Sequence, residues 1–229
     1  MEKLNPKNYE IISFDCYGTL VDWSQGITEY LMPVFLAHDA HVIDSWVIEY
    51  FANIEPNIQK STPSYEDVLV KVLESFADRL GFTPTKEEVS NFAKSVAVSK
   101  PFDDTVDSLK ALQEEFDLVI ISNTDSELFA LTQKSLDINF SEVITSEEVG
   151  AYKPDPKIFD ETLKKLKSSR VLHVAQSLYH DIQPASAAGI DTVRIDRYKG
   201  GSDPARTLSA KPTWSFDSLA DFANALLND

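Results

Sequence analysis

Residues 10–20 read Glu10-Ile11-Ile12-Ser13-Phe14-Asp15-Cys16-Tyr17-Gly18-Thr19-Leu20, an acid at the end of a short apolar run followed by a sharp break. The apolar residues before Asp15 fit a buried parallel strand, and Gly18 tolerates backbone angles that larger residues resist. In open α/β sheets, ligands bind in the crevice beyond the carboxyl ends of the strands. The stretch therefore predicts that Asp15 is presented at the mouth of a sheet as a nucleophile.

From Pro101 onward, strand-like and helix-like segments alternate. The predicted strands cover residues 118–122, 142–145, 171–175 and 192–195, and the predicted helices cover 104–115, 126–135, 156–166, 182–188 and 217–227. This alternation predicts an α/β fold, a doubly wound parallel sheet with helices on both faces. The loop-like stretch at residues 200–204 is expected to border the active site.

A long helical insertion separates the first two strands. Apolar residues recur at helical spacing within 27–35, 46–54 and 68–80. A chain of 229 residues is long enough for a core carrying a smaller insertion. We therefore expect an inserted helical cap domain at residues 23–100 and an α/β core domain at residues 1–22 and 101–229, with Pro101 marking the return to the core.

The charge balance narrows the possible partners. The formal net charge of −16 argues against nucleic acid and against an anionic membrane surface, so we expect a small-molecule substrate. No apolar run approaches the ~20 residues of a spanning helix, and residues 1–6 lack the pattern of a signal sequence. The single cysteine, Cys16, agrees with a reducing compartment. These features predict a cytoplasmic protein.

The motif from Asp15 to Leu20 resembles the first motif of the haloacid dehalogenase-like (HAD) superfamily, and its Asp-x-Tyr-Gly-Thr-Leu form resembles the (S)-2-haloacid dehalogenase branch. Further matching segments follow in the expected order at residues 120–123, 150–155 and 174–177, leading to Asp181 and Gly189. The resemblance covers most of the chain. It implies a HAD-like Rossmannoid core with a helical cap, and it suggests a homodimer formed through the cap.

The resemblance also implies catalytic roles. Asp15 would be the nucleophile, and its ionised carboxylate would form an ester intermediate. Lys153 would offset the negative charge around it, and the hydroxyls of Thr19 and Ser122 would hydrogen-bond one oxygen of Asp15 and aim the other. Asp181 would pair with Lys153 or orient the hydrolytic water. Each also has an ordinary structural alternative, because such acids and hydroxyls cap helices and most lysines lie on the surface.

Other residues are expected to face the substrate. In the dehalogenases a residue matching Asn123 helps to hold the departing halide, and His173 and His180 are candidate general bases. Aromatic residues of the cap, Trp23, Tyr50 or Phe51, are expected to line the pocket or simply to fill the core of the cap. The expected substrate-binding residues are Asn123, Tyr17, Tyr152 and Ser177.

The leaving group favours dehalogenation over phosphate transfer. HAD phosphatases usually carry an acid two positions after the nucleophile, where this chain has Tyr17, and a phenol of pKa ~10 is a poor substitute. A halide leaves without needing a proton. Gln176 also stands where magnesium-dependent relatives have an acid. We therefore expect no cofactor, or a weakly held Mg²⁺ on Asp15, the carbonyl of Tyr17 and Asp181.

The match to the dehalogenases is incomplete. Characterised members present an arginine from the cap to grip the substrate carboxylate, whereas this insertion has Trp46 and Glu66 in the comparable region. Its one arginine, Arg79, has the character of a charge at a helix C-terminus. Leu178 replaces an asparagine that supports the water. We therefore consider three hypotheses: a dehalogenase acting on a small 2-haloacid-like substrate, a Mg²⁺-dependent small-molecule phosphatase, and a non-catalytic scaffold that binds a metabolite.

Overall fold

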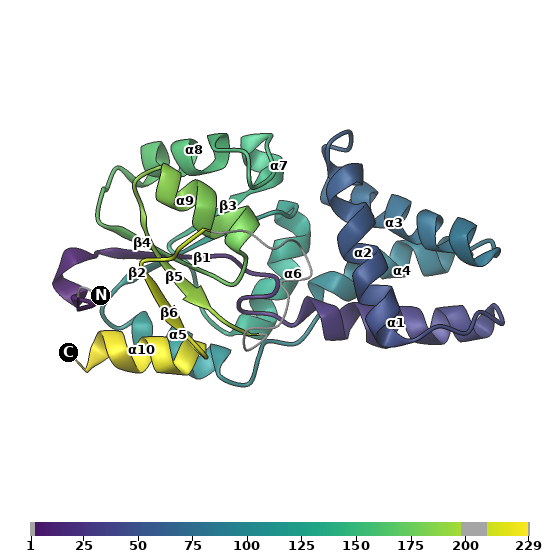
Figure 1. The fold of residues 1–229 in the computed structure, drawn as a ribbon, viewed down its shortest axis with the longest axis horizontal. Coiled ribbons are helices and arrows are strands. Elements are labelled where there is room, and N and C mark those ends of the chain that lie inside the picture. The colour runs from purple at the N-terminus through teal and green to yellow at the C-terminus, as the bar shows by residue number, and fades with distance from the viewer. Residues whose placement is uncertain (1–2, 198–209, 229) are drawn as a thin grey trace.

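A six-stranded, fully parallel sheet forms the centre of the protein in the order β3-β2-β1-β4-β5-β6 (Figure 1). The computed structural model describes residues 3–197 and 210–228. The strands are β1 (Ile11–Phe14), β2 (Asp117–Ser122), β3 (Glu142–Thr145), β4 (Val171–Ala175), β5 (Asp191–Ile195) and β6 (Trp214–Phe216). The predicted α/β class with a parallel sheet is confirmed.

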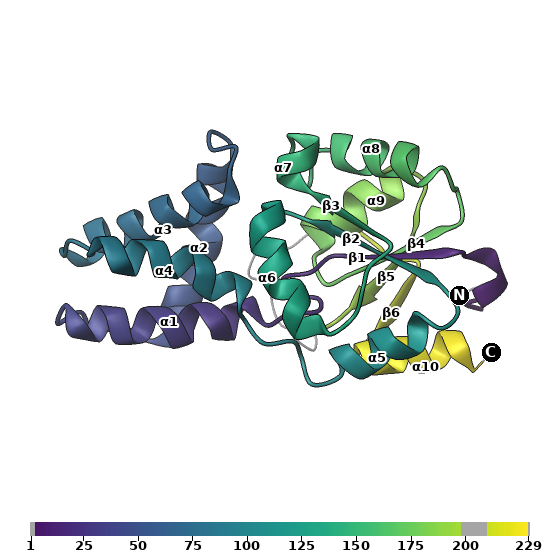
Figure 2. The ribbon, with the colours of Figure 1, turned by 180° about the vertical axis from the view of Figure 1, so that it is seen from behind.

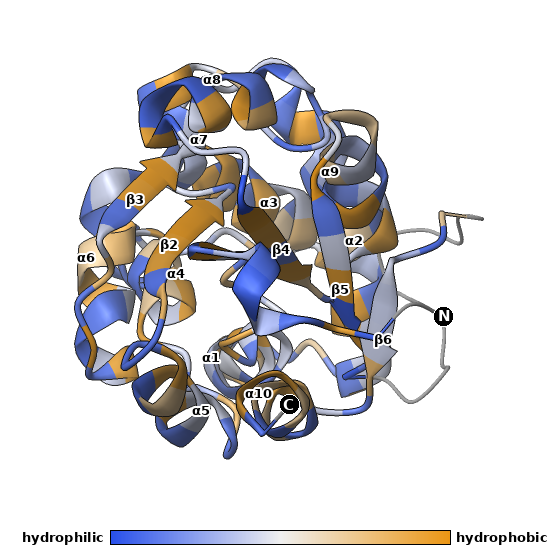
Figure 3. Ribbon diagram, turned by 90° about the vertical axis from the view of Figure 1, so that its left-hand side faces the viewer, coloured by the Kyte–Doolittle hydropathy of each residue, from blue (hydrophilic) through white to orange (hydrophobic). Residues whose placement is uncertain are grey.

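Helices cover both faces of this sheet. On one face, α5 (Thr105–Leu112), α6 (Ser126–Leu136) and α10 (Leu219–Leu227) share a hydrophobic cluster with Ile12 and Phe14. On the other face, α8 (Lys157–Leu166) and α9 (Gln183–Ala187) pack with Ile11. The short elements are η1 (Pro6–Asn8), α7 (Ser146–Val149) and the π-helical η2 (Leu178–Ile182). Figure 3 shows the apolar character of β2 and β3 against helices of mixed hydropathy, as expected for a sheet buried on both faces.

Four helices form a separate bundle beside the sheet, and we call them the cap helices (Figures 1 and 2). They are α1 (Trp23–Ala37), α2 (Asp44–Gln59), α3 (Tyr65–Leu80) and α4 (Lys86–Ala97). They share a hydrophobic cluster of their own that includes Phe35 and Phe76, and Leu128 of α6 joins it from the core. The bundle therefore has its own apolar interior and meets the core through α6.

Besides the short elements η1, α7 and η2, the structure adds helix α4 and strand β6 to those expected. Helix α4 begins with a reciprocal capping box between Thr85 and Glu88 and buries Phe92 and Val96, so both its start and its apolar face can be read from the sequence. Strand β6 is only three residues long and is too short for its pattern to stand out. The helix expected at 182–188 is preceded by the π-helical turn at 178–182.

Other expectations remain as they were. Residues 200–204, expected near the active site, lie outside the described residues. The division into a core at 1–22 and 101–229 and a cap at 23–100 stays a prediction. None of the described helices combines the length and the apolar character needed to cross a bilayer.

Candidate active site

Asp15 follows the central strand β1, at the carboxyl edge of the sheet. The chain then curls back, because the backbone N–H of Leu20 donates to the carbonyl of Cys16 at 2.8 Å and Gly18 takes a φ of +94°. Few residues other than glycine adopt that φ readily. The turn brings the hydroxyl of Thr19 to 2.6 Å from Oδ2 of Asp15. The local sequence thus presents the carboxylate and holds one of its oxygens, as predicted for Thr19.

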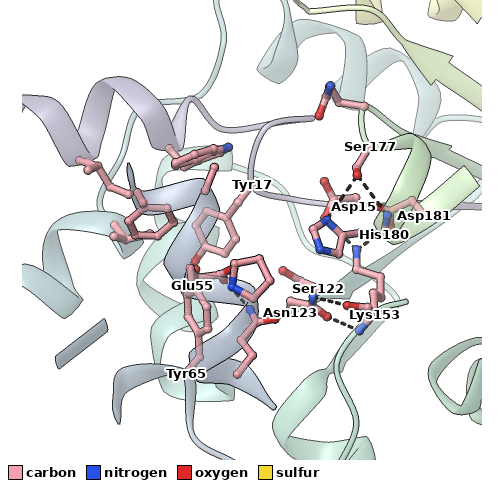
Figure 4. A pocket seen from close by; sticks show the side chains of 18 residues that line it. Asp15, Tyr17, Glu55, Tyr65, Ser122, Asn123, Lys153, Ser177, His180 and Asp181 are labelled. Carbon is pink, nitrogen blue, oxygen red and sulfur yellow. Dashed lines mark hydrogen bonds and ion pairs between the residues drawn. The ribbon is translucent and has the colours of Figure 1, made fainter. Parts of the chain in front are cut away.

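Lys153 lies at the centre of the site and is almost fully buried, with 2% of its surface exposed. Its ammonium donates to Oδ1 of Asp15 at 2.8 Å, to Oδ1 of Asp181 at 2.6 Å and to the carbonyl of Ile121 at 2.8 Å. Asn123 positions this lysine, since its amide accepts from the Lys153 N–H at 2.6 Å and donates to the Lys153 carbonyl at 3.0 Å (Figure 4).

The charges of this cluster depend on one another. Burial raises the pKa of Asp15 above its usual value, against the opposing attraction of Lys153. Burial also acts to raise the pKa of Asp181, but Lys153 and His173 lower it to about 2. Burial acts to lower the pKa of Lys153, and the two carboxylates raise it above its usual value. Asp181 and Lys153 are therefore both charged at neutral pH, and the ammonium favours the ionised form of Asp15.

The two histidines occupy different places. His173 is fully buried in β4, and its ring joins Oδ1 of Asp181 at 3.1 Å to the hydroxyl of Ser13 at 2.9 Å. His180 instead lines the cavity in front of Asp15. Of the two candidate bases, His180 is the one that faces the cavity, and His173 holds Asp181 from behind.

A cavity of about 110 Å³ lies between the core and the cap helices. Its volume is comparable to that of a ~150 Å³ protein cavity that holds one benzene molecule. The core contributes polar residues, namely Asp15, Tyr17, Ser122, Asn123, Lys153, Gln176, Ser177, His180 and Asp181. The cap helices contribute Trp23, Ile27, Phe51, Ala52, Glu55, Pro56, Gln59, Tyr65 and Val96. The arrangement suits a molecule of a few heavy atoms.

The structure distributes the expected aromatic residues unequally. Trp23 and Phe51 line the cavity, whereas Tyr50 stacks on Trp46 inside the cap. Tyr17 lines the cavity too, but its phenol is hydrogen-bonded to Thr132 at 2.7 Å and burial raises its pKa.

Tyr152, expected to bind substrate, lies in an adjoining cavity that shares Gln59, Lys153 and His180 with the first. Its hydroxyl donates to the carbonyls of Thr62 and Pro63 in the cap, so it ties the two parts of the protein together. The adjoining cavity is the larger of the two, with a volume of about 780 Å³.

One predicted contact is wrong. The hydroxyl of Ser122 was expected to bond Asp15, but it has no hydrogen-bond partner within the described part of the chain. Strand β2 ends with Ser122 beside the cavity, where the turn of Thr19 already supplies the hydroxyl for Asp15. The amide nitrogen of Gln176 also lacks a partner among the described residues. Both residues line the cavity, and the hydrogen-bonding capacity of each buried donor is unused among the described residues.

The sequence analysis did not identify the three cap residues that bring a carboxyl, an amide and a phenol group to the cavity, namely Glu55, Gln59 and Tyr65. Burial raises the pKa of Glu55 to about 7, although a hydrogen bond with Tyr65 acts to lower it. Gln59 donates to the same carboxylate. The signal was in the sequence, because Glu55 and Gln59 continue the buried stripe of α2 that begins with Val47 and Phe51 at intervals of four residues.

The donor set is poorly suited to a divalent cation. Within residues 3–197 and 210–228, no group of three or more histidine, cysteine, aspartate or glutamate side chains is placed to hold a metal ion. Gln176 offers a neutral amide beside the nucleophile, and the ammonium of Lys153 already joins Asp15 to Asp181. A hard cation such as Mg²⁺ prefers carboxylate oxygens. These residues therefore do not form a tight magnesium site.

Known proteins resemble this chain in sequence and in fold. The family model of the haloacid dehalogenase-like hydrolases matches residues 9–189. An (S)-2-haloacid dehalogenase of Pseudomonas fluorescens is 26% identical over 230 residues, covering 97% of this chain and 98% of the relative. A pyrimidine 5'-nucleotidase of Escherichia coli is 30% identical over 158 residues, covering 67% of this chain and 68% of the relative. The crystal structure of a defluorinating L-2-haloacid dehalogenase superposes with a TM-score of 0.83 at 23% identity, covering 95% of each chain.

Proposed function

Because the chain belongs to the haloacid dehalogenase-like hydrolase family, we propose that it hydrolyses the carbon–halogen bond of a small 2-haloacid-like substrate with Asp15 as the nucleophile. The observation that carries this proposal is the buried cluster in which Lys153 and Thr19 hold the two oxygens of Asp15 at the floor of a small cavity. The likeness to haloacid dehalogenases along nearly the whole chain supports the same reaction.

In the first step an oxygen of Asp15 attacks the carbon that bears the halogen, from the side opposite the halogen. A carbon–oxygen bond forms as the carbon–halogen bond breaks, and the halide leaves with the bonding electron pair. The hydrogen-bond donors that line the cavity, Ser122, Asn123 and Gln176, are suited to receive that anion. The product of this step is an ester of Asp15.

In the second step water attacks the carbonyl carbon of the ester. The bond between that carbon and the substrate oxygen breaks, the substrate leaves as an alcohol, and one proton is released. Asp181 stays anionic and can orient the water, but a carboxylate with a pKa of about 2 is too weak a base to take its proton. His180, which lines the cavity, is the group we assign to that task.

A phosphatase is the second candidate, supported by the relative named as a nucleotidase. Two features oppose it. The phenol of Tyr17 is bonded to Thr132 and has a raised pKa, so it is a poor acid for a leaving alkoxide. A cavity of about 110 Å³ is also too small to enclose a whole nucleotide. A non-catalytic scaffold is disfavoured by the charged cluster itself.

Further properties are part of the same proposal. We place the boundaries of the cap at residues 23–100, and we assign substrate contacts to Asn123, Tyr17 and Ser177 in the cavity and to Tyr152 in the adjoining cavity. The net charge of −16 and the single cysteine support a cytoplasmic enzyme that does not bind nucleic acid. A homodimer through the cap stays a prediction.

The test is a substrate panel of (S)-2-haloacids and phosphate esters, each assayed with EDTA or with Mg²⁺. Halide release that is insensitive to the chelator supports the proposal, and metal-dependent phosphate release would support the phosphatase instead. A single turnover in oxygen-18 water then tests the covalent route. The label is expected in the peptide that contains Asp15, and label that enters the product directly would exclude the ester.

A further inference from the structure

The wall of the cavity that faces Asp15 carries another acid. Glu55 of α2 and Tyr65 of α3 line the cavity (Figure 4). Gln59, one turn further along α2, lines it as well. Glu55 has 9% of its surface exposed. A buried acid of this kind needs hydrogen-bond partners, and it is rarely placed at a ligand cavity without a use.

The charges around the cavity disfavour a substrate that carries a carboxylate. The described lining residues include three acids, Asp15, Glu55 and Asp181, and Lys153 is the one lysine or arginine among them. A bound carboxylate would stand near several carboxylates. Like charges in a poorly solvated space repel one another strongly.

Lys153 cannot serve such an anion. An ammonium has three N–H donors, and those of Lys153 already reach Asp15, Asp181 and the carbonyl of Ile121 at 2.6–2.8 Å. Binding a substrate carboxylate would require one of these bonds to break. Among the described lining residues, no lysine or arginine is therefore free to bind a carboxylate.

The same wall is well equipped to accept hydrogen bonds. A carboxylate has about four lone-pair sites on its two oxygens. Gln59 and Tyr65 each engage Glu55, and the remaining sites are available to a ligand. Because both partners come from the cap helices, they hold Glu55 in place before any substrate binds.

Building on the function proposed above, we propose that Glu55 is a specificity-determining residue that accepts hydrogen bonds from the non-reacting end of the substrate. That end is a primary amide, a neutral hydrogen-bond donor, in place of a carboxylate. A 2-haloamide has nearly the shape of a 2-haloacid and a carbonyl group that activates the neighbouring carbon in the same way. It differs in offering N–H donors to Glu55 and in carrying no charge.

The first experiment compares (S)-2-chloropropionamide with (S)-2-chloropropionate at pH 8, measuring kcat/KM for chloride release. The wild-type protein is expected to prefer the amide by about tenfold or more, the usual worth of a hydrogen bond to a charged group. Glu55→Gln should remove most of that preference. Glu49→Gln, an exposed acid on the same helix, should leave it unchanged. Preference for the carboxylate, or a ratio that Glu55→Gln does not alter, would overturn the inference.

The second experiment separates recognition from chemistry. Binding of propionamide and of propionate, which carry no halogen, is measured by calorimetry on the wild-type protein and on Asp15→Asn. Tighter binding of the amide supports the role of Glu55 even if no halide is ever released, in which case only the proposed dehalogenation fails. Tighter binding of propionate, or no binding of the amide, contradicts the role of Glu55 whatever the kinetics show.

Discussion

The ammonium nitrogen of Lys153 lies 2.8 Å from a carboxylate oxygen of Asp15, although the two residues are 138 positions apart in the chain. The same nitrogen lies 2.6 Å from Asp181. One buried cation thus joins two acids that would otherwise repel each other. Its removal should affect both the ionisation of the nucleophile and the stability of the fold.

We expect Lys153→Met to move the acid limb of the pH profile for halide release upward by about 1–3 pH units, because Asp15 loses the charge that favours its ionised form. We also expect the free energy of unfolding to fall by about 3–5 kcal/mol, since two carboxylates are left without their buried partner. Halide release as a function of pH and urea denaturation measure these effects. Lys164→Met, at an exposed lysine of α8, is the control and should change neither. An unchanged pH profile in Lys153→Met would refute the role.

The hydroxyl of Thr19 links the nucleophile to the neighbouring loop, because it donates to Asp15 at 2.6 Å and accepts from the N–H of Gln176 at 2.9 Å. Thr19→Val keeps the shape and removes the hydroxyl. We expect it to lower the rate of halide release about 10- to 100-fold, as for loss of a hydrogen bond to a charged group. Thr19→Ser should retain most of the rate in the same assay. Equal rates for the two variants would show that the hydroxyl does not aim Asp15.

Glu55 should make the stability of the protein depend on pH. Its pKa is raised from 4.5 to about 7, so between these values the folded protein holds a proton that the unfolded chain has lost. The free-energy cost of burying ionised Glu55 is therefore absent below about pH 4.5. It reaches its full value, on the order of 3 kcal/mol, above pH 7. Relative to the wild type, Glu55→Gln should gain stability from pH 5 to pH 8 by urea denaturation. A constant difference between the two proteins would contradict the raised pKa.

Asp125 attaches the core to the cap helices. Its carboxylate accepts hydrogen bonds from the backbone N–H groups of Tyr65 and Glu66 at 2.8 Å each, at the first turn of α3. We expect Asp125→Ala to loosen this junction, because two N–H donors and the favourable charge at a helix N-terminus are lost together. Trypsin cleavage after Lys60 should then become faster. Asp78→Asn, at the exposed far end of α3, should leave the cleavage rate as in the wild type.

Local patterns were sufficient to predict much of this protein. The apolar run before Asp15 and the turn at Gly18 predicted a strand that ends in a carboxylate, and the structure places both there. The ordered motifs predicted that Lys153 and Asp181 would join it, and they do. Such features depend on residues close together in the chain or on a recurring order of strands, both of which can be read along a sequence.

Other features depend on which side chains meet across the fold. The sequence by itself determined the parallel sheet, the helical insertion and the acid that begins the chemistry. Only the tertiary structure decided that Thr19, and not Ser122, hydrogen-bonds Asp15. It also decided that His173 bonds Asp181 from inside the sheet and that Glu55 lines the same cavity as the nucleophile. The reason is physical: a pattern along the chain sets which face of a helix or strand is buried, but the packing of distant segments sets what that face touches.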